Sequence, residues 1–159
     1  MSELIKFVVN GHAVAIDGDG TAPLLSVLHD HLGLRGSKFG CGTEMCGSCM
    51  VLVDGQPEHS CAREIASLAG RTITTIEALS NHNALHPLQQ AFLDEQAGQC
   101  GYCLSGILIS ASALLAKNPK PSRAEIITAL DPHLCRCGIH NRVFRAIQKA
   151  GAAMARAQG

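Results

Sequence analysis

Eight cysteines form two sets of four that differ in their internal spacing. The first set follows a C-x4-C-x2-C-x11-C pattern, the second a C-x2-C-x31-C-x-C pattern, and 38 residues lie between them. The members are Cys41, Cys46, Cys49 and Cys61 in the first set, and Cys100, Cys103, Cys135 and Cys137 in the second. Four thiolates are the ligands of one [2Fe–2S] cluster, and C-x4-C-x2-C followed by a distant cysteine is the plant-type ferredoxin spacing. The sequence therefore predicts an electron carrier with two [2Fe–2S] clusters.

Other uses of the cysteines stay open at this point. Zinc could take the second set, because a four-cysteine zinc site tolerates a long loop, but zinc explains the spacing of the first set poorly. Structural disulfides are disfavoured because the N-terminus has no apolar stretch of signal-peptide length. A Rieske centre would replace two cysteines by histidines, and Cys137-Gly-Ile-His140 resembles only half of one.

The first half of the chain has the pattern of short strands around an irregular loop. Residues 35–49 hold three cysteines and have neither a strand nor a helix period, and their glycines let backbone N–H groups turn toward a bound anion. The elements expected around this loop are strands at 4–9 and around 14–16 joined by an Asn10-Gly11 turn, a helix over 23–32 closed by Gly33, a hairpin over 50–60 and a strand over 72–76. This order is that of a β-grasp.

After about residue 77 the apolar period changes to that of helices. The expected helices run from His86-Pro87 to about Gly98, over 104–116, from the Ser122 capping box to Leu130, and from about Ile139 through Met154. The predicted fold class is therefore α+β. A plant-type ferredoxin-like β-grasp domain over residues 1–76 is followed by a small four-helix bundle domain over 77–159, with 77–85 as the linker.

The second cysteine set lies at two of these helix starts. Cys100 and Cys103 precede the second helix, and Cys135 and Cys137 precede the fourth. Helix N-termini carry partial positive charge and free N–H groups, which favours an anionic cluster. If residues 135–137 are extended, both sulfurs face one side while Arg136 turns away.

The formal net charge of zero is unevenly distributed. Residues 1–131 carry 8 basic and 13 acidic side chains, whereas residues 132–159 carry 5 basic ones and no acid. This basic segment is either a solvated helix end or a charge that offsets the clusters or faces an anionic partner cofactor. An aromatic content of 3% gives no support for nucleic-acid binding. No segment is long and apolar enough for membrane insertion, so we expect a cytoplasmic protein that meets a membrane only through a partner.

Three motifs in order resemble one protein family. They are Gly40-Cys-Gly-Thr-Glu-Met-Cys-Gly-Ser-Cys49, Gln99-Cys-Gly-Tyr-Cys103 and Leu134-Cys-Arg-Cys-Gly138. Together they resemble the small iron–sulfur subunit of the molybdenum hydroxylases, the xanthine oxidase family, over nearly the whole chain. Much of that family has Thr-Pro where this chain has Leu104-Ser105. This departure is shared with subunits of bacterial dehydrogenases of N-heteroaromatics, the nicotinate type in particular.

The resemblance implies a mechanism and partners. A large subunit would carry molybdopterin, in its cytosine dinucleotide form, and would hydroxylate an N-heteroaromatic such as nicotinate. Electrons would pass to the cluster of the helical domain, then to the ferredoxin-like cluster, then to a cytochrome, a flavin subunit or another carrier. The resemblance also places Gln99 and Cys137 beside the pterin, whereas the residues alone allow Gln99 merely to cap the loop after Gly98. The same role in an aldehyde or purine oxidoreductase, a free two-cluster ferredoxin and a zinc-stabilised interaction module stay as alternatives.

Overall fold

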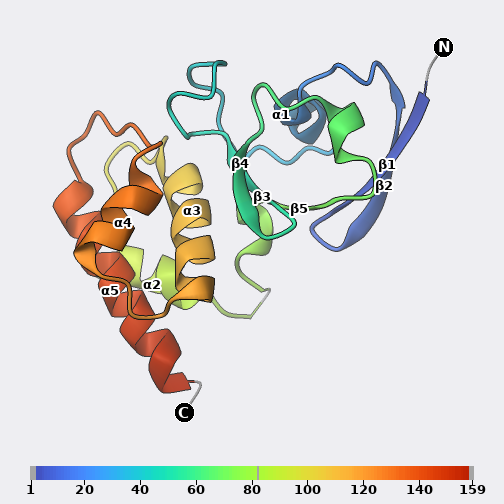
Figure 1. The fold of residues 1–159 in the computed structure, drawn as a ribbon. Coiled ribbons are helices and arrows are strands. Elements are labelled where there is room, and N and C mark those ends of the chain that lie inside the picture. The colour runs from blue at the N-terminus through green and yellow to red at the C-terminus, as the bar shows by residue number, and fades with distance from the viewer. Residues whose placement is uncertain (1–2, 82, 158–159) are drawn as a thin grey trace.

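The computed structural model describes residues 3–81 and 83–157. Met1 and Ser2, the first residues of the N-terminal stretch considered above, lie outside these residues. The chain forms a sheet half, residues 3–78, and a helical half, residues 87–157, that lie side by side (Figure 1). This arrangement confirms the predicted α+β class.

The sheet half is built on five strands in the order β2-β1-β5-β3-β4. Strands β1 (Glu3–Val9) and β2 (His12–Gly18) pair antiparallel, as predicted. Their turn has φ of 51° at Asn10 and 81° at Gly11, the two left-handed positions of a type I′ hairpin. The predicted second hairpin is also present, as β3 (Met50–Val53) and β4 (Gln56–His59). Strand β5 (Thr72–Thr74) lies between β1 and β3, parallel to β1 and antiparallel to β3.

Three details of the sheet half differ from the sequence expectation. The helix expected over 23–32 begins as α1 (Leu24–Ser26) but continues as a π-helix, Val27–His31, before Gly33. The last strand ends at Thr74 because the side-chain oxygen of Asn10 accepts the N–H of Thr75 at 2.9 Å. Two 3-10 helices, Ile65–Leu68 and Ile76–Ala78, were not predicted. A hydrophobic core between the sheet and α1 unites the elements, with Leu24, Leu28, Ile65 and Ile73 fully buried.

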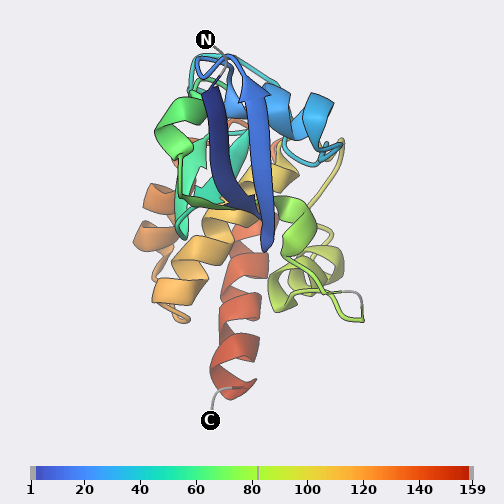
Figure 2. The same ribbon diagram turned by 90° about the vertical axis from the view of Figure 1, so that its right-hand side faces the viewer.

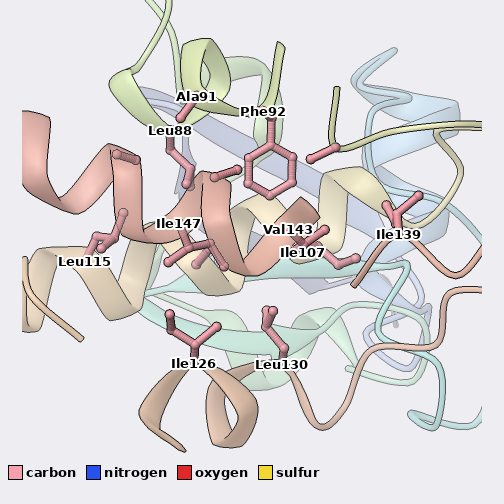
Figure 3. Packing of buried hydrophobic residues seen from close by; sticks show 14 of the residues in the cluster. Leu88, Ala91, Phe92, Ile107, Leu115, Ile126, Leu130, Ile139, Val143 and Ile147 are labelled. Atoms are coloured by element: carbon pink, nitrogen blue, oxygen red, sulfur yellow. The ribbon is translucent and has the colours of Figure 1, made fainter. Parts of the chain in front are cut away.

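The helical half contains α2 (Pro87–Asp94), α3 (Leu104–Lys117), α4 (Arg123–Leu130) and α5 (His140–Ala157). Their apolar faces meet in one hydrophobic core, in which side chains of all four helices point toward one another (Figure 3). The predicted capping box is present, since Ser122 and Glu125 exchange side-chain-to-backbone hydrogen bonds. Helix α2 ends before the expected Gly98, because Gln96 adopts a left-handed φ of 50°. Within residues 3–81 and 83–157, no helix is long and apolar enough to cross a membrane.

Helix α3 joins the two halves, because it packs on β3 and β4 as well as on the other helices (Figure 1). At its C-terminal end, the Lys117 ammonium donates to the side-chain oxygen of Gln56 at 2.7 Å. Near its start, Gly106 lies so close to the carbonyl oxygen of Gly47 that a Cβ at Gly106 would overlap it. Helix α5 lies farther from the sheet than α3 (Figure 1), and its C-terminal part extends beyond the other helices (Figure 2).

Candidate metal centres

The loop that precedes β3 wraps its backbone around two thiols. The N–H groups of Thr43 and Met45 point at the sulfur of Cys41, at 3.4 and 3.2 Å, and the N–H of Cys41 points at the sulfur of Cys46 at 3.4 Å. The N–H of Thr43, foremost, and the N–H of Met45 lower the pKa of the Cys41 thiol to about 6. The loop thus stabilises a thiolate, the form in which cysteine binds metals.

A Cβ would not fit at the base of this loop. At Gly40 it would lie 2.6 Å from the sulfur of Cys46. Gly42 and Gly47 have φ of 70° and 74°, in the left-handed region that L side chains rarely adopt. The glycines predicted to turn N–H groups toward an anion therefore do so around cysteine sulfur.

The other two cysteines of the first set flank the second hairpin. Cys49 immediately precedes β3 and Cys61 follows β4, and both are buried. Burial, foremost, and the neighbouring thiol of Cys49 together raise the pKa of Cys61 to about 11, although the N–H of Glu44 acts to lower it. The Glu44 contact brings this pair to the loop that carries Cys41 and Cys46, so the structure gathers the whole first set.

The cysteines of the second set lie at the starts of α3 and α5, as the sequence predicted. Cys103 is the residue immediately before the first turn of α3, and Cys137 lies three residues before α5. The thiols of Cys103 and Cys135 interact, and burial, foremost, raises the pKa of Cys103 to about 12. Cys100, which shares the C-x2-C motif with Cys103, also contributes to that shift.

The extended geometry expected for residues 135–137 is wrong. Arg136 and Cys137 form a turn instead. Burial acts to raise the pKa of Cys135, but N–H groups of Ile139, Cys137 and Gly138 outweigh it, and the pKa is lowered. With this turn in place, the N–H groups of all three residues lie close to the sulfur of Cys135.

The arrangement fits an iron–sulfur cluster better than zinc. Zinc needs its ligands around a single point. A [2Fe–2S] cluster instead takes two protein ligands on each of two irons. The structure contains such pairs of neighbouring thiols. They are Cys41 with Cys46, Cys49 with Cys61, and Cys103 with Cys135.

The two cysteine sets are also tied to each other. The N–H of Leu134, which precedes Cys135, donates to the carbonyl oxygen of Cys46 at 3.0 Å. The hydroxyl of Tyr102, between Cys100 and Cys103, donates to the carbonyl oxygen of Phe39. No spacing in the sequence indicates these contacts, because each joins residues far apart in the chain.

His133 is a buried residue of this region that the sequence reasoning missed. Its Nε2 lies 2.7 Å from the hydroxyl oxygen of Ser110 on α3, and the residue is 6% exposed. Burial, foremost, and the nearby His59 lower the pKa of its imidazole to about 4, so the ring is neutral at neutral pH. In the sequence, His133 has no ligand-like spacing that distinguishes it from the other histidines.

Gln99 and Cys137 are brought together. The side-chain amide of the exposed Gln99 donates to the carbonyl oxygen of Cys137 at 3.2 Å. This contact ties the loop before Cys100 to the turn before α5. It serves a loop-fixing role and leaves the remaining amide groups of Gln99 at the surface.

Much of the basic C-terminal segment pairs with α2. Arg145 contacts Glu95 at 3.1 Å, and Lys149 contacts Asp94 at 2.8 Å. The guanidinium of Arg142 donates to the backbone carbonyl of Gln96 at 3.2 Å. These charges hold α5 against α2, a use that neither of the two sequence-based interpretations contained.

Comparison with known proteins shows that each cysteine set lies in a range that matches a family of iron–sulfur domains. Residues 33–90 match the family of 2Fe-2S iron-sulfur cluster binding domains, and residues 75–148 match the family of [2Fe-2S] binding domains. The chain is 46% identical over 150 residues to a nicotinate dehydrogenase subunit of Pseudomonas putida, an alignment that covers 94% of this chain and 96% of the relative. It is 47% identical over 148 residues to the alpha subunit of isoquinoline 1-oxidoreductase from Brevundimonas diminuta, with 92% and 97% covered. A chain in the crystal structure of quinoline 2-oxidoreductase from Pseudomonas putida 86 has the same fold, with a TM-score of 0.91, 35% identity, and 98% and 97% covered.

Proposed function

Because the chain belongs to the iron–sulfur small subunits of the molybdenum hydroxylase family, we propose that it carries electrons from a molybdopterin centre in a separate large subunit to an outside acceptor. The acceptor is a cytochrome, a flavin subunit or another carrier. The observation that carries the proposal is the presence of two complete four-cysteine sets, each with thiols in contact and N–H groups directed at sulfur.

Each set is proposed to hold one [2Fe–2S] cluster. Cys41, Cys46, Cys49 and Cys61 would be the ligands in a β-grasp domain over residues 1–76, and Cys100, Cys103, Cys135 and Cys137 those in a four-helix bundle domain over residues 77–159. When bound, each cluster takes up and releases one electron at a time. The chain's own part is to hold the thiolates in pairs and to donate N–H groups to sulfur, which is one of the levers by which proteins set reduction potential.

We further propose that Gln99 and Cys137 contact the pterin of the large subunit. Two observations support this. Gln99 is exposed while its amide already fixes the carbonyl of Cys137 at 3.2 Å, so the two residues present a common surface. Gly138 follows with a φ of 72°, and without a side chain it permits a close approach to the backbone at this point.

An apolar rim around the cysteine loops supports a large partner. It consists of Phe39, Met45, Tyr102 and Leu134, which are 50–70% exposed. Hydrogen bonds hold these residues close to one another. The hydroxyl of Tyr102 donates to the carbonyl oxygen of Phe39, and the N–H of Leu134 donates to the carbonyl oxygen of Cys46, which follows Met45 in the chain. Large exposed apolar side chains gathered in one region mark interaction sites. We propose that the large subunit covers this rim.

The proposed substrate of the whole complex is an N-heteroaromatic such as nicotinate, with molybdopterin in its cytosine dinucleotide form. The relatives support this proposal, since three of them are named for nicotinate, isoquinoline and quinoline. The substrate pocket itself would belong to the large subunit.

The test is the composition and reduction of the native complex. We expect about four iron and four sulfide per small chain, since each cluster has two irons, together with molybdenum and a larger subunit. Anaerobic nicotinate should reduce both clusters and give two distinct EPR signals. Zinc near one per chain, or one signal only, would contradict the two-cluster assignment.

Gln99→Ala tests the pterin contact in the same complex. Both EPR signals and assembly should persist, while substrate reduces the clusters more slowly and the molybdenum signal shifts. Gln90→Ala, an exposed glutamine on α2, is the matched control. Parental rates and a parental molybdenum signal in Gln99→Ala would leave Gln99 with the loop-fixing role alone.

A further inference from the structure

We propose that His133 is a positioning residue that fixes the two cysteine loops relative to each other. It thereby sets the gap that an electron crosses between the two sets. This role rests on the proposed two-cluster function. Passage of one electron oxidises one centre and reduces the other, and it moves no atom or proton, so its rate depends on separation and coupling. A residue that fixes the separation can control that rate without touching either centre.

The first observation is that His133 is attached to the helical half. Its Nε2 lies 2.7 Å from the hydroxyl oxygen of Ser110, and both side chains are buried. Ser110 lies in the middle of α3, the helix that packs on β3. The imidazole is therefore held by the helix that connects the two halves.

The second observation is that the other edge of the ring fits the loop of the first set. A Cβ at Gly47 would overlap Nδ1 of His133 and would lie 2.7 Å from the carbonyl oxygen of Pro132. Gly47 is buried and lies between Cys46 and Cys49. The imidazole thus occupies the space that a side chain at Gly47 would need, and the loop closes directly on the ring.

The third observation is the hydrogen bond next to the ring. Leu134 follows His133, and its N–H donates to the carbonyl oxygen of Cys46 at 3.0 Å. Cys46 belongs to one proposed ligand set, and Leu134 immediately precedes Cys135 of the other. Displacement of His133 therefore moves a backbone hydrogen bond that ties the two sets together.

The experiment uses the assembled complex and three variants. His133→Ala removes the ring, His133→Gln keeps an amide that can reach Ser110, and Ser110→Ala removes only the hydroxyl. His12→Ala, at an exposed site in β2, is the control. Iron content, the EPR interaction between the two reduced centres, and the rate at which reduction spreads from one centre to the other are measured.

We expect every variant to keep both signals. His133→Ala should lose the parental magnetic interaction and slow the spread of reduction, Ser110→Ala should show a smaller change in the same direction, and His133→Gln should restore most of the parental behaviour. If His133→Ala does not assemble, Ser110→Ala still tests the role, because its magnetic interaction should be weaker and its spread of reduction slower than in the parental complex. Parental interaction and rate in every variant that assembles would overturn it. A parental complex with a single centre would instead contradict the proposed function and not the packing of His133.

Discussion

Replacing Gly47 by alanine should destabilise the protein more than the same change at Gly11, although the two glycines have nearly the same backbone conformation. Their φ values are 74° and 81°. The difference lies in their surroundings. A Cβ at Gly11 meets no atom within 4 Å, whereas a Cβ at Gly47 meets His133 and, at 2.7 Å, the carbonyl oxygen of Pro132.

The two costs can be separated. A left-handed backbone costs an alanine about 1–2 kcal/mol at either site. Overpacking of a buried contact adds about 1–3 kcal/mol at Gly47 only. For a chain of this size, 1 kcal/mol corresponds to roughly 2–4 °C in Tm. We therefore expect Gly47→Ala to melt roughly 2–12 °C below Gly11→Ala.

The assay follows melting of the iron-loaded protein by circular dichroism and by visible absorption, so that unfolding and cluster loss are seen together. In Gly47→Ala the visible absorption should disappear at or below the temperature of unfolding, because the strained loop holds three cysteines. Equal Tm values for the two variants would refute the reasoning, since they would mean that His133 and Pro132 move away from a Cβ at position 47 with no loss of stability.

Three further predictions concern a helix cap, its pH dependence and a ligand. Ser122→Ala should cost about 1 kcal/mol and lower Tm by roughly 2–4 °C, because it leaves an N-terminal N–H of α4 without its partner. Hydrogen bonds from the Ser122 backbone, foremost, and from Asn118 lower the pKa of Glu125 below 4.5, so its stabilisation is present above that pH and is lost as the pH falls through the lowered value. Melting curves between neutral and acid pH should accordingly show a smaller acid loss for Glu125→Gln than for the parental chain. Cys41→Ala should remove one of the two EPR signals and leave the other, and loss of both would mean that the sets do not load independently.

Elements set by local chemistry were predictable from the sequence. The Asn10-Gly11 turn, the Ser122 capping box and the start of α3 after Cys103 each depend on residues within a few positions of one another. Alternating and helical apolar periods placed most strands and helices, because burial of one face decides those elements. The short C-x4-C-x2-C, C-x2-C and C-x-C spacings are local patterns of the same kind, whereas the 31 residues between Cys103 and Cys135 are bridged only by the fold.

What the sequence did not reveal depends on contacts between distant residues. At the turn of Arg136 and Cys137, N–H groups of three following residues lie close to the sulfur of Cys135, and cysteine spacing alone does not distinguish this turn from an extended pair. The fit of His133 against Gly47 joins residues from the two halves of the chain. The spacing of apolar residues over 23–32 likewise predicts a helix, but it does not distinguish a π-helix from an α-helix.

The order of the strands leaves the sheet with two unlike edges. At one edge, β4 contains Pro57, which has no N–H to offer to another strand, and Gln56 beside it is held by Lys117. At the other edge, β2 pairs with β1 alone among the strands that the structure describes, and Asp17 is the only charged side chain among its residues. Unpaired strand edges act as templates for another chain. Any self-association by strand pairing should therefore begin at β2, and an added lysine on that strand should weaken it.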